Sequence, residues 1–399
     1  MRGDGTSDRG CIAVLNAGSS SVKFALYEAG DKGALLFRGQ VEQLGLAPRM
    51  KVVDARGETV ARRKWTNDQL DHRRATEEIL RLGRELLGGR HVVGIGHRVV
   101  HGGARFDAPA RIDPEVMKYL GTLVPLAPLH QPHNLAPIEA IAEAAPHLPQ
   151  VACFDTAFHR SQTALVEHYA LPRDITESGV RRYGFHGLSY DYIVHRLAET
   201  MPMLARGRLV IAHLGNGASL CAVADGKSVA STMGFTALDG LMMGTRTGAL
   251  DPGVLLYLLM ERRMSPKDIE DLLYRKSGLL GVSGISSDMR TLRQSSEPEA
   301  AEAIALFVYR IVREIGSMAA ALGGVDGLVF TAGIGENDAS TRSEVAAGCG
   351  WLGLALDEER NKRGETRIHA EGSRCTAWVV PTDEERMIAR YTGRLLAAA

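Results

Sequence analysis

The sequence predicts an α/β protein built from two similar halves. Apolar segments of strand length alternate along the chain with amphipathic helical segments, which is the pattern of this class. Residues 11–27 (CIAVLNAGSSSVKFALY) contain an apolar run, a small polar turn and a second run of alternating character, which together predict a β-hairpin. Residues 208–230 repeat that arrangement about half a chain later. With 399 residues, about two domains are expected.

The other elements are predicted from the same periodicities. Residues 67–88 predict an amphipathic helix. Its expected core contacts are Leu70, Ile79, Leu82 and Leu86. Prolines interrupt residues 112–150, so broken helical pieces are expected there, with no regular helix around His130. Ser189 is expected to cap a helix, and Asp251 with the following proline to begin another. Strands are expected at 30–66, 91–101, 151–155 and within 328–337, where a glycine loop follows.

The composition excludes several classes of function. Lys+Arg and Asp+Glu both number 47, so the net charge is zero, which argues against a general nucleic-acid or anionic-membrane binder. The five cysteines are scattered, form no CxxC pair and fall mostly in apolar runs, so we expect inert buried thiols and a cytoplasmic location. No secretory signal is visible, and the longest apolar stretch, around Val254–Met260, is too short to span a membrane.

The turn of the first hairpin has the chemistry of a phosphate site. It offers three serine hydroxyls (Ser19, Ser20 and Ser21), backbone N–H groups and the ammonium of Lys23, all of which favour a negative charge. An ordinary polar hairpin tip is the alternative interpretation. A second and a third turn, HLGNG (213–217) and GIGEN (333–337), also follow apolar strands. Halves of related topology with such turns facing a cleft have the architecture of the actin-like ATPases.

Five further residues are candidates for catalysis, and the first four of them also have a plainer interpretation. Arg98 shares a strand face with a valine and could bind a small carboxylate, or it is a surface arginine. Asp155 ends a buried strand, where α/β sheets place ligand groups, or it caps a helix. His130 lies in a loop and could simply be solvated. His186 precedes a helix, where an anion is favoured, or it is structural. Arg246 lies in a long glycine-rich segment and could clamp a phosphoryl group.

Ten ordered motifs give the chain a close resemblance to the acetate kinases, from about Ile12 to Ala389. The motifs are LNAGSSSVKF, GHRVVHGG, PLHQPHN, FDTAFH, RRYGFHGLSY, AHLGNGASL, MGFTALDGLMMGTRTG, KSGLLGVSGISSDMR, FTAGIGEN and PTDEER. The resemblance implies two actin-like (ribonuclease H-like) domains, covering 1–155 with 385–399 and 156–384. It also implies the reaction ATP + acetate ⇌ ADP + acetyl phosphate with Mg²⁺, for which Mn²⁺ can substitute, in a homodimer.

The same resemblance implies roles for individual residues. Arg98 and Arg246 would bind the acyl carboxylate and neutralise the transferring phosphoryl group. His186 would hydrogen-bond that group, Asp155 would orient the site or act through the metal, and His130 would support it. The metal site would be held by Asn16 and Glu384. The acyl pocket would be lined by Val100, Leu129, Phe185 and Ala237. The nucleotide would contact Ser19, Ser21, Lys23, His213, Leu214, Gly215, Asn216, Gly217, Asp288, Met289, Arg290, Gly333, Ile334, Gly335, Glu336 and Asn337.

Three positions depart from the family pattern. Ala237 stands where a proline is usual, which would enlarge the acyl pocket and admit propionate. Met289 stands where an aromatic residue is common near the adenine, and Ala249 where an aspartate is common. Propionate kinase is therefore the nearest alternative. An actin-like ATPase without acyl chemistry would have no use for Arg98, His186 and Arg246 together, and a sugar kinase would need a base and a more polar pocket.

Overall fold

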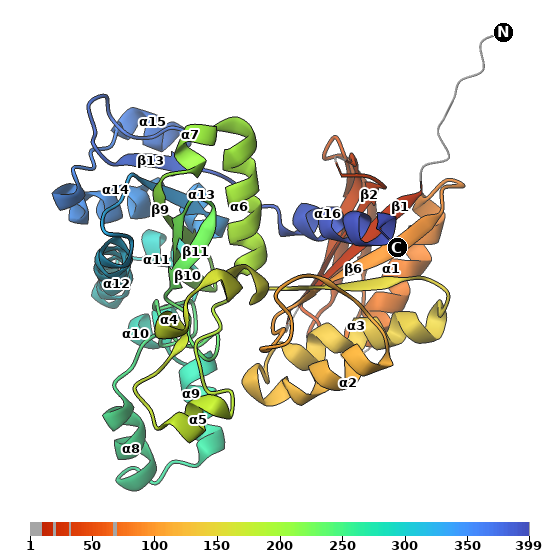
Figure 1. Cartoon of the computed structure of the whole chain (residues 1–399), viewed down its shortest axis with the longest axis horizontal. Helices are drawn as coiled ribbons and strands as arrows, with labels where there is room; N and C mark the ends of the chain where they lie inside the picture. Colours follow the sequence, from red (N-terminus) through yellow and green to blue (C-terminus); the bar gives the residue numbers. More distant parts are fainter. Residues whose placement is uncertain (1–9, 19–20, 32, 67–69, 399) are drawn as a thin grey trace. The chain divides into compact units, whose positions relative to one another are not determined.

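The computed structural model describes residues 10–18, 21–31, 33–66 and 70–398. The chain forms two compact units (Figure 1). Unit 1 consists of Met1–Ala157 and Asp383–Ala399, and unit 2 of Phe158–Thr382. Each unit contains its own β-sheet and is described below by itself.

The sheet of unit 1 has the strand order β5-β4-β3-β2-β1-β6-β8-β7. The strands from β1 to β5 pair antiparallel, whereas β6 pairs parallel with both β1 and β8. The predicted hairpin at 11–27 is therefore confirmed, as are strands within 30–66. The bounds are β1 Cys11–Ala17, β2 Ser21–Glu28, β3 Leu35–Glu42, β4 Arg49–Asp54, β5 Thr59–Lys64, β6 Val92–Val99, β7 Ala110–Arg111 and β8 Gln150–Phe154.

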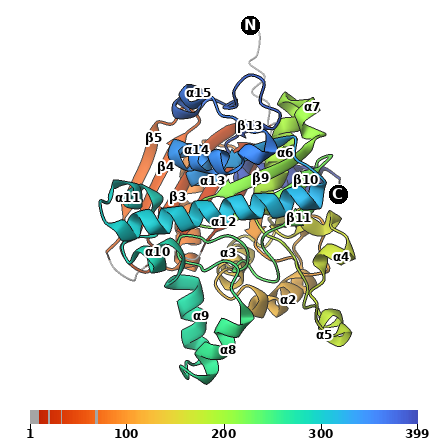
Figure 2. The same cartoon turned by 90° about the vertical axis from the view of Figure 1, so that its left-hand side faces the viewer.

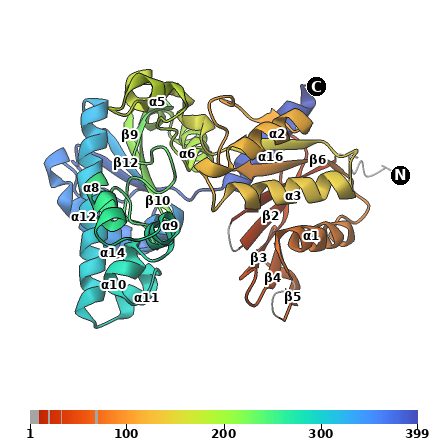
Figure 3. The same ribbon diagram turned by 90° about the horizontal axis from the view of Figure 1, so that it is seen from below.

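Helices cover both faces of this sheet. Ile95 of β6 packs in a core with α1 and α3, which lie side by side (Figure 3). Because side chains alternate along a strand, Gly94 and Gly96 face the opposite side, where α16 lies. A Cβ built on Gly96 would lie 2.2 Å from Oγ1 of Thr392, so only glycine permits this close packing. The helices of unit 1 are α1 His72–Leu86, α2 Pro114–Thr122, η1 Val124–Leu126, α3 Gln131–Ala144 and α16 Glu384–Ala397.

Two expectations for unit 1 need revision. The helix predicted at 67–88 begins at His72, after an N-cap whose carboxylate accepts a hydrogen bond from a backbone N–H, and residues 67–69 lie outside the described residues. Leu70, Ile79 and Leu82 are buried as expected, and Leu86 packs at the edge of the core. The expectation of no regular helix around His130 is wrong. The residue is the N-cap of α3, which has one proline in its first turn, where the missing N–H costs nothing, and another in its interior.

The sheet of unit 2 repeats the central topology of the first. Its order, β11-β10-β9-β12-β13, matches β3-β2-β1-β6-β8, with a hairpin on one side of the central strand and two parallel strands on the other. The predicted relation between the two halves is thus present in the strand order. The bounds are β9 Arg208–Leu214, β10 Ala218–Ala224, β11 Lys227–Ser231, β12 Gly327–Thr331 and β13 Thr376–Val379.

Two long helices cover this second sheet. The helix α12 crosses one face (Figure 2), and α6 packs on the other through Tyr190, Ile193 and Leu197. The helical segments that begin between Ala157 and Glu358 are η2 Ala157–Ser161, α4 Ala164–Glu167, α5 Arg173–Glu177, α6 Gly187–Thr200, α7 Pro202–Ala205, α8 Pro252–Met260, α9 Pro266–Arg275, α10 Gly278–Ser283, α11 Met289–Gln294, α12 Pro298–Leu322, α13 Ala332–Asn337, α14 Ala339–Gly348, η3 Gly350–Leu352 and α15 Glu358–Arg363.

Two expectations for unit 2 are wrong in detail, and one is confirmed. The GIGEN segment is the short helix α13 and not a glycine loop. His186, with φ 58°, is the N-cap of α6, so Ser189 lies inside the first turn and its hydroxyl is used elsewhere. Residues 232–250 contain no helix or strand, and Asp251 caps α8 as predicted, with proline in the first turn.

The cysteines behave as inert core residues. All five are buried free thiols, and burial raises the pKa of the Cys221 thiol to about 12 even though Ser228 opposes the shift. Among the described residues, no helix is both long and apolar enough to cross a membrane.

Candidate active site

The sequence-predicted residues fall into one group in each unit. In unit 1 the group gathers where β1, β6 and β8 end, next to the start of α16. In unit 2 it gathers around the end of β9, the start of α6 and the irregular segment 232–250. The carboxyl ends of parallel strands meet at one edge of a sheet, which is why residues distant in sequence come together there.

A buried ion pair is the centre of the unit 1 group. Arg98 lies on β6, on the face that α16 covers, and its Nη2 is 2.6 Å from Oδ2 of Asp155. Its Nε is 3.1 and 3.2 Å from the two carboxylate oxygens, so the contact is bidentate. Burial by itself lowers the pKa of Arg98, but the negative charges of Asp155 and Glu384 outweigh it and raise that pKa. The guanidinium is therefore a fixed cation.

Asn16 joins this ion pair to two glutamates of α16. Its Oδ1 accepts a hydrogen bond from Nη1 of Arg98 at 3.3 Å. Its Nδ2 donates to Oε2 of Glu384 at 3.2 Å and to Oε1 of Glu385 at 2.9 Å. Burial raises the pKa of Glu385, and the charge of Glu384 adds to this shift, whereas Lys23 opposes it. Glu385 was not among the predicted metal residues, although its place beside Glu384 at a helix start pointed to it.

The chemistry of this donor set fits a divalent metal. Two adjacent carboxylates supply the hard oxygen ligands that Mg²⁺ prefers, and Mg²⁺ normally keeps waters and substrate phosphates as its remaining ligands. The described residues contain no cluster of three or more His, Cys, Asp or Glu that could hold a metal ion. The oxygen of Asn16 faces Arg98, so in this arrangement its amide orients both charges.

Lys23 lies directly opposite Asn16 across the β1–β2 ladder and is exposed. Ser21 begins β2 and its backbone carbonyl closes the hairpin turn by accepting from the N–H of Gly18 at 2.8 Å. Ser19, like Ser20, lies outside the described residues, so its predicted contact with the nucleotide stays a prediction.

The acyl-pocket candidates of unit 1 surround the end of β6. Val100 is buried, and its N–H donates to Oδ1 of Asn134 at 2.9 Å. The amide of Asn134 donates in turn to the carbonyl of Ala17 at 2.6 Å, which ties α3 to the ends of β1 and β6. Leu129 and His130 are half-buried just before α3. Asn134 is a second residue that sequence reasoning missed, since a buried asparagine has no local signature.

In unit 2, two histidines stack at the end of β9. The rings of His186 and His213 have centroids 4.1 Å apart and an interplanar angle of 18°. Nδ1 of His186 lies 2.8 Å from Oγ of Ser219, and Nδ1 of His213 lies 2.8 Å from Oγ of Ser189. Ser189 also donates to Oγ1 of Thr382 at 2.9 Å. The two serines were not predicted as site residues.

The turn that follows β9 is shaped by glycines. Gly215 donates its N–H to the carbonyl of Gly217 at 3.1 Å, which closes the turn, and Leu214 is buried before it. A Cβ on Gly217 would lie 3.1 Å from Nε2 of His186, so a side chain there would crowd the imidazole. Asn216 at the tip is exposed and accepts a backbone hydrogen bond from Gly244.

Arg246 and Ala237 are joined by a direct contact. The Nη1 of Arg246 donates to the carbonyl of Ala237 at 3.1 Å, so the same segment shapes the predicted acyl pocket and holds the predicted phosphoryl clamp. Tyr169, which lies outside the irregular segment 232–250, holds that segment in place. Its hydroxyl accepts a hydrogen bond from the N–H of Phe235 at 2.8 Å. Arg182 lies over the Tyr169 ring and donates to Asp239 at 3.1 Å. Neither Tyr169 nor Arg182 was predicted.

Phe185 is buried, and its carbonyl lies 2.9 Å from Nε2 of His159. The ring nitrogen Nδ1 of that histidine lies 2.9 Å from Oγ of Ser228. Burial lowers the pKa of His159 to about 4, so it is a neutral structural histidine beside the predicted acyl pocket.

The remaining nucleotide candidates lie at two short helices. Asp288 caps α11 and forms an exposed ion pair with Arg290, while Met289 is buried. The side chain of Glu336 in α13 is used in hydrogen bonds within unit 2. Its Oε1 accepts from the backbone N–H groups of Ala332 at 2.8 Å and Thr382 at 3.1 Å. The other predicted positions of this segment also lie within the six residues of α13; they are Gly333, Ile334, Gly335 and Asn337.

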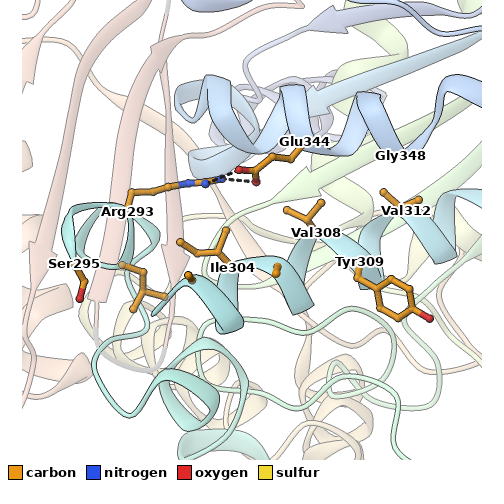
Figure 4. A pocket seen from close by; sticks show the side chains of 11 residues that line it. Arg293, Ser295, Ile304, Val308, Tyr309, Val312, Glu344 and Gly348 are labelled. Carbon is orange, nitrogen blue, oxygen red and sulfur yellow. Dashed lines mark hydrogen bonds and ion pairs between the residues drawn. The ribbon is translucent and has the colours of Figure 1, made fainter. Parts of the chain in front are cut away.

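A surface cavity of about 600 Å³ in unit 2 lies between α11, α12 and α14. Its lining is mainly apolar, with Ile304, Val308 and Tyr309 from α12, and an ion pair of Arg293 with Glu344 closes one side (Figure 4). None of the predicted site residues lines it.

The central strands of the two sheets have the same order, and each sheet has polar groups where its strands end. These features define a two-domain α/β protein of the actin-like class. Comparison with known proteins agrees. The chain matches the Acetokinase family over residues 11–390 and belongs to that family. It is 54% identical over 390 residues to an acetate kinase of Rhodopseudomonas palustris, covering 96% of this chain and 98% of the relative. An acetate kinase of Methylocella silvestris is 52% identical over 395 residues, with 97% and 98% covered.

Solved structures confirm the fold. A propionate kinase from Francisella tularensis superposes with a TM-score of 0.89 at 35% identity, covering 96% of this chain and 99% of that one. The acetate kinase of Porphyromonas gingivalis superposes with a TM-score of 0.86 at 40% identity, covering 97% and 100%. The predictions of the family and of two actin-like halves are therefore confirmed.

Proposed function

We propose that this chain is an acetate kinase, which transfers the terminal phosphoryl group of ATP to acetate and gives ADP and acetyl phosphate. The observation that carries the proposal is the 54% identity over 96% of the chain to an acetate kinase. The chemistry supports it, because a carboxylate is already an anionic nucleophile at neutral pH and needs no strong base. The difficulty is to bring two anions together, and fixed cations and hydrogen-bond donors solve that difficulty.

Arg98 and Arg246 are the proposed cations. Arg98 is held by Asp155 and Asn16, which is the support for assigning Asp155 an orienting role and not proton abstraction. Arg246 is aimed by the carbonyl of Ala237 and would neutralise the transferring phosphoryl group. His186 would donate a hydrogen bond to the same group, with His130 in support.

The metal is proposed to be Mg²⁺, with Mn²⁺ as a substitute, held by Glu384 and by water through Glu385 and Asn16. When bound, the metal would lower the charge repulsion between the nucleotide phosphates and the carboxylate. The nucleotide would contact Lys23, Ser19 and Ser21 of the first hairpin, the turn at 213–217, the start of α11 and α13.

The acyl specificity is proposed to be acetate first, with propionate accepted. Val100, Leu129, Phe185 and Ala237 would line the pocket, and Ala237 is smaller than the proline usual in the family. Selection against one extra methylene is worth only about 10- to 200-fold, so activity with both acids is expected. One similar solved structure is that of a propionate kinase, so propionate kinase activity is the alternative to test.

The domains are proposed as 1–155 with 385–399 and 156–384, in a cytoplasmic homodimer. Large apolar side chains exposed on unit 2, several of them close together on α8, support self-association, because clustered exposed apolar side chains often mark an interface. They are Leu256, Tyr257, Leu259 and Met260 on α8, Leu306 and Tyr309 on α12, and Trp351 on η3.

A hydroxamate assay with ATP, Mg²⁺ and acetate, propionate or butyrate tests the proposal. Acetate should give the highest kcat/KM, propionate a lower one and butyrate the lowest. A preference for propionate would favour the alternative kinase. ATP hydrolysis that no acid stimulates would refute acyl transfer altogether.

A further inference from the structure

A chain of three side chains connects α6, β10 and the imidazole of His186. Ser219 lies on the face of β10 that packs against α6, and its side chain is fully buried. Its Oγ lies 2.8 Å from Nδ1 of His186. The hydroxyl of Tyr190, one turn further along α6, bonds the same Oγ. Tyr190 is also fully buried, with its ring in the core beside Ile193.

Counting protons decides the direction of these bonds. The Tyr190 and Ser219 hydroxyls each carry one proton and can each accept. If Tyr190 donates to Ser219, and Ser219 donates to Nδ1 of His186, both hydroxyl protons have an acceptor. If His186 instead donates from Nδ1, then either Ser219 or Tyr190 retains a buried proton that has no acceptor among the contacts of these hydroxyls. An unsatisfied buried donor is costly, so the first arrangement is favoured.

We propose that Tyr190 and Ser219 are positioning residues that hold His186 in the tautomer with its proton on Nε2. The hydrogen bond at one imidazole nitrogen sets the state of the other, so Nε2–H becomes the donor. The inference rests on the proposed function, because the acceptor of that donor would be the transferring phosphoryl group.

Two further contacts fix where the Nε2–H lies. The ring stacks on His213, which sets its plane. Nε2 lies against the glycine turn after β9, close enough that a Cβ on Gly217 would be 3.1 Å away. His213 is held by Ser189 through its own Nδ1, so a hydroxyl orients each ring of the stack from the same nitrogen.

The tautomer can be measured without any activity assay. Histidine-selective ¹⁵N labelling of the full chain, at about pH 8 where an ordinary imidazole is neutral, resolves protonated from unprotonated ring nitrogens. The resonance is assigned by its loss in His186→Gln. We expect Nε2 protonated and Nδ1 unprotonated in the wild type, and a mixture in Ser219→Ala. Protonated Nδ1 in the wild type would overturn the proposal, whatever reaction the protein catalyses.

Kinetics supply the second test. Ser219→Ala and Tyr190→Phe should each lower kcat on the order of 10-fold, the value of one lost hydrogen bond, with KM for ATP unchanged. Thr76→Val, which deletes a buried hydroxyl bonded to the carbonyl of His72 in α1, is the control for hydroxyl loss and should retain kcat. Unchanged kcat in both variants, with an acyl kinase activity present in the wild type, would refute the positioning role while leaving the proposed function standing.

Discussion

The central strands of the two sheets carry different chemistry at matching places. In unit 1 the next-to-last residues of β1 and β6 are Asn16 and Arg98, and Asp155 follows β8. By strand order the equivalents in unit 2 are His213, Phe330 and Val380. Unit 1 therefore holds a buried ion pair, Arg98 with Asp155, at the two places where unit 2 has apolar side chains.

The difference shows that the shared sheet topology fixes where side chains lie at the strand ends but does not determine whether they are charged. Unit 2 obtains its polar groups from outside the parallel strands, with His186 at the start of α6 and Arg246 in the irregular segment 232–250. Unit 1 is accordingly expected to depend on charge pairing, and unit 2 on neutral hydrogen bonds and backbone shape. The predictions below test that contrast.

Arg98→Ala should have the largest effect. It would remove the arginine that pairs with Asp155, whose side chain is 1% exposed, and the loss of one partner of a buried ion pair costs about 3–5 kcal/mol of unfolding free energy. Acyl kinase kcat/KM should also fall on the order of 10³-fold, because a transition-state cation is lost. Denaturant unfolding and the hydroxamate assay measure the two effects.

The control is Arg208→Ala, which breaks an ion pair with Asp326 whose side chains are 43% and 46% exposed. An exposed pair contributes about 0–1 kcal/mol, so little change is expected. Equal loss of stability in the two variants would contradict the importance of burial in unit 1.

Arg246→Ala should lower kcat in the hydroxamate assay on the order of 10³-fold, as for other arginines at phosphoryl transfer. The guanidinium donates to the carbonyl of Ala237 at 3.1 Å and lies 3.9 Å from the thioether sulfur of Met243, and both contacts would be lost with it. Arg275→Ala, from an exposed pair on α9, is the matched control. A near-normal kcat would remove Arg246 from the site.

Tyr169→Phe tests whether backbone shape matters in unit 2. The change removes the acceptor of the Phe235 N–H, a loss of about 1–3 kcal/mol if that group stays buried, and it loosens the segment that aims Arg246. We expect kcat for acetate to fall about 10-fold and the preference for acetate over propionate to weaken. Tyr309→Phe, at an exposed tyrosine, should change neither. A normal kcat in Tyr169→Phe would show that the segment holds its shape without this bond.

Glu385→Gln should have the smallest effect. We expect this effect in the pH dependence of the free energy of unfolding. The pKa of Glu385 is raised in the folded state because its charged form is buried. Its contribution therefore weakens folding as pH rises from the ordinary value of 4.5 through the raised pKa. Glutamine retains an acceptor for Asn16 and cannot ionise, so this decline should be missing from unfolding curves of the variant. A decline of equal size in both proteins would exclude Glu385 as its source.

The sequence predicted most of the framework because periodicity and turns are local signals. The hairpin at 11–27 and the cap at Asp251 both follow from neighbouring residues. His130 was misassigned because prolines are tolerated early in a helix. GIGEN was misassigned because a helix of six residues is too short to show a periodicity. The sequence contains no local signal for Asn134, Ser219 and Tyr169. Each of them acts through hydrogen bonds to partners that lie 29 to 117 positions away.

The return of α16 to unit 1 has a consequence for how the protein is made. Unit 1 lacks its last helix until residues 383–398 have been synthesised, and two of its glycines, Gly94 and Gly96, present a bare strand surface until Leu396 and Thr392 arrive. Unit 2, which is continuous in sequence, is complete first. At about 5–20 residues per second the ribosome needs on the order of tens of seconds to synthesise unit 2. During that time the face of β6 that α16 covers in the folded protein stays uncovered.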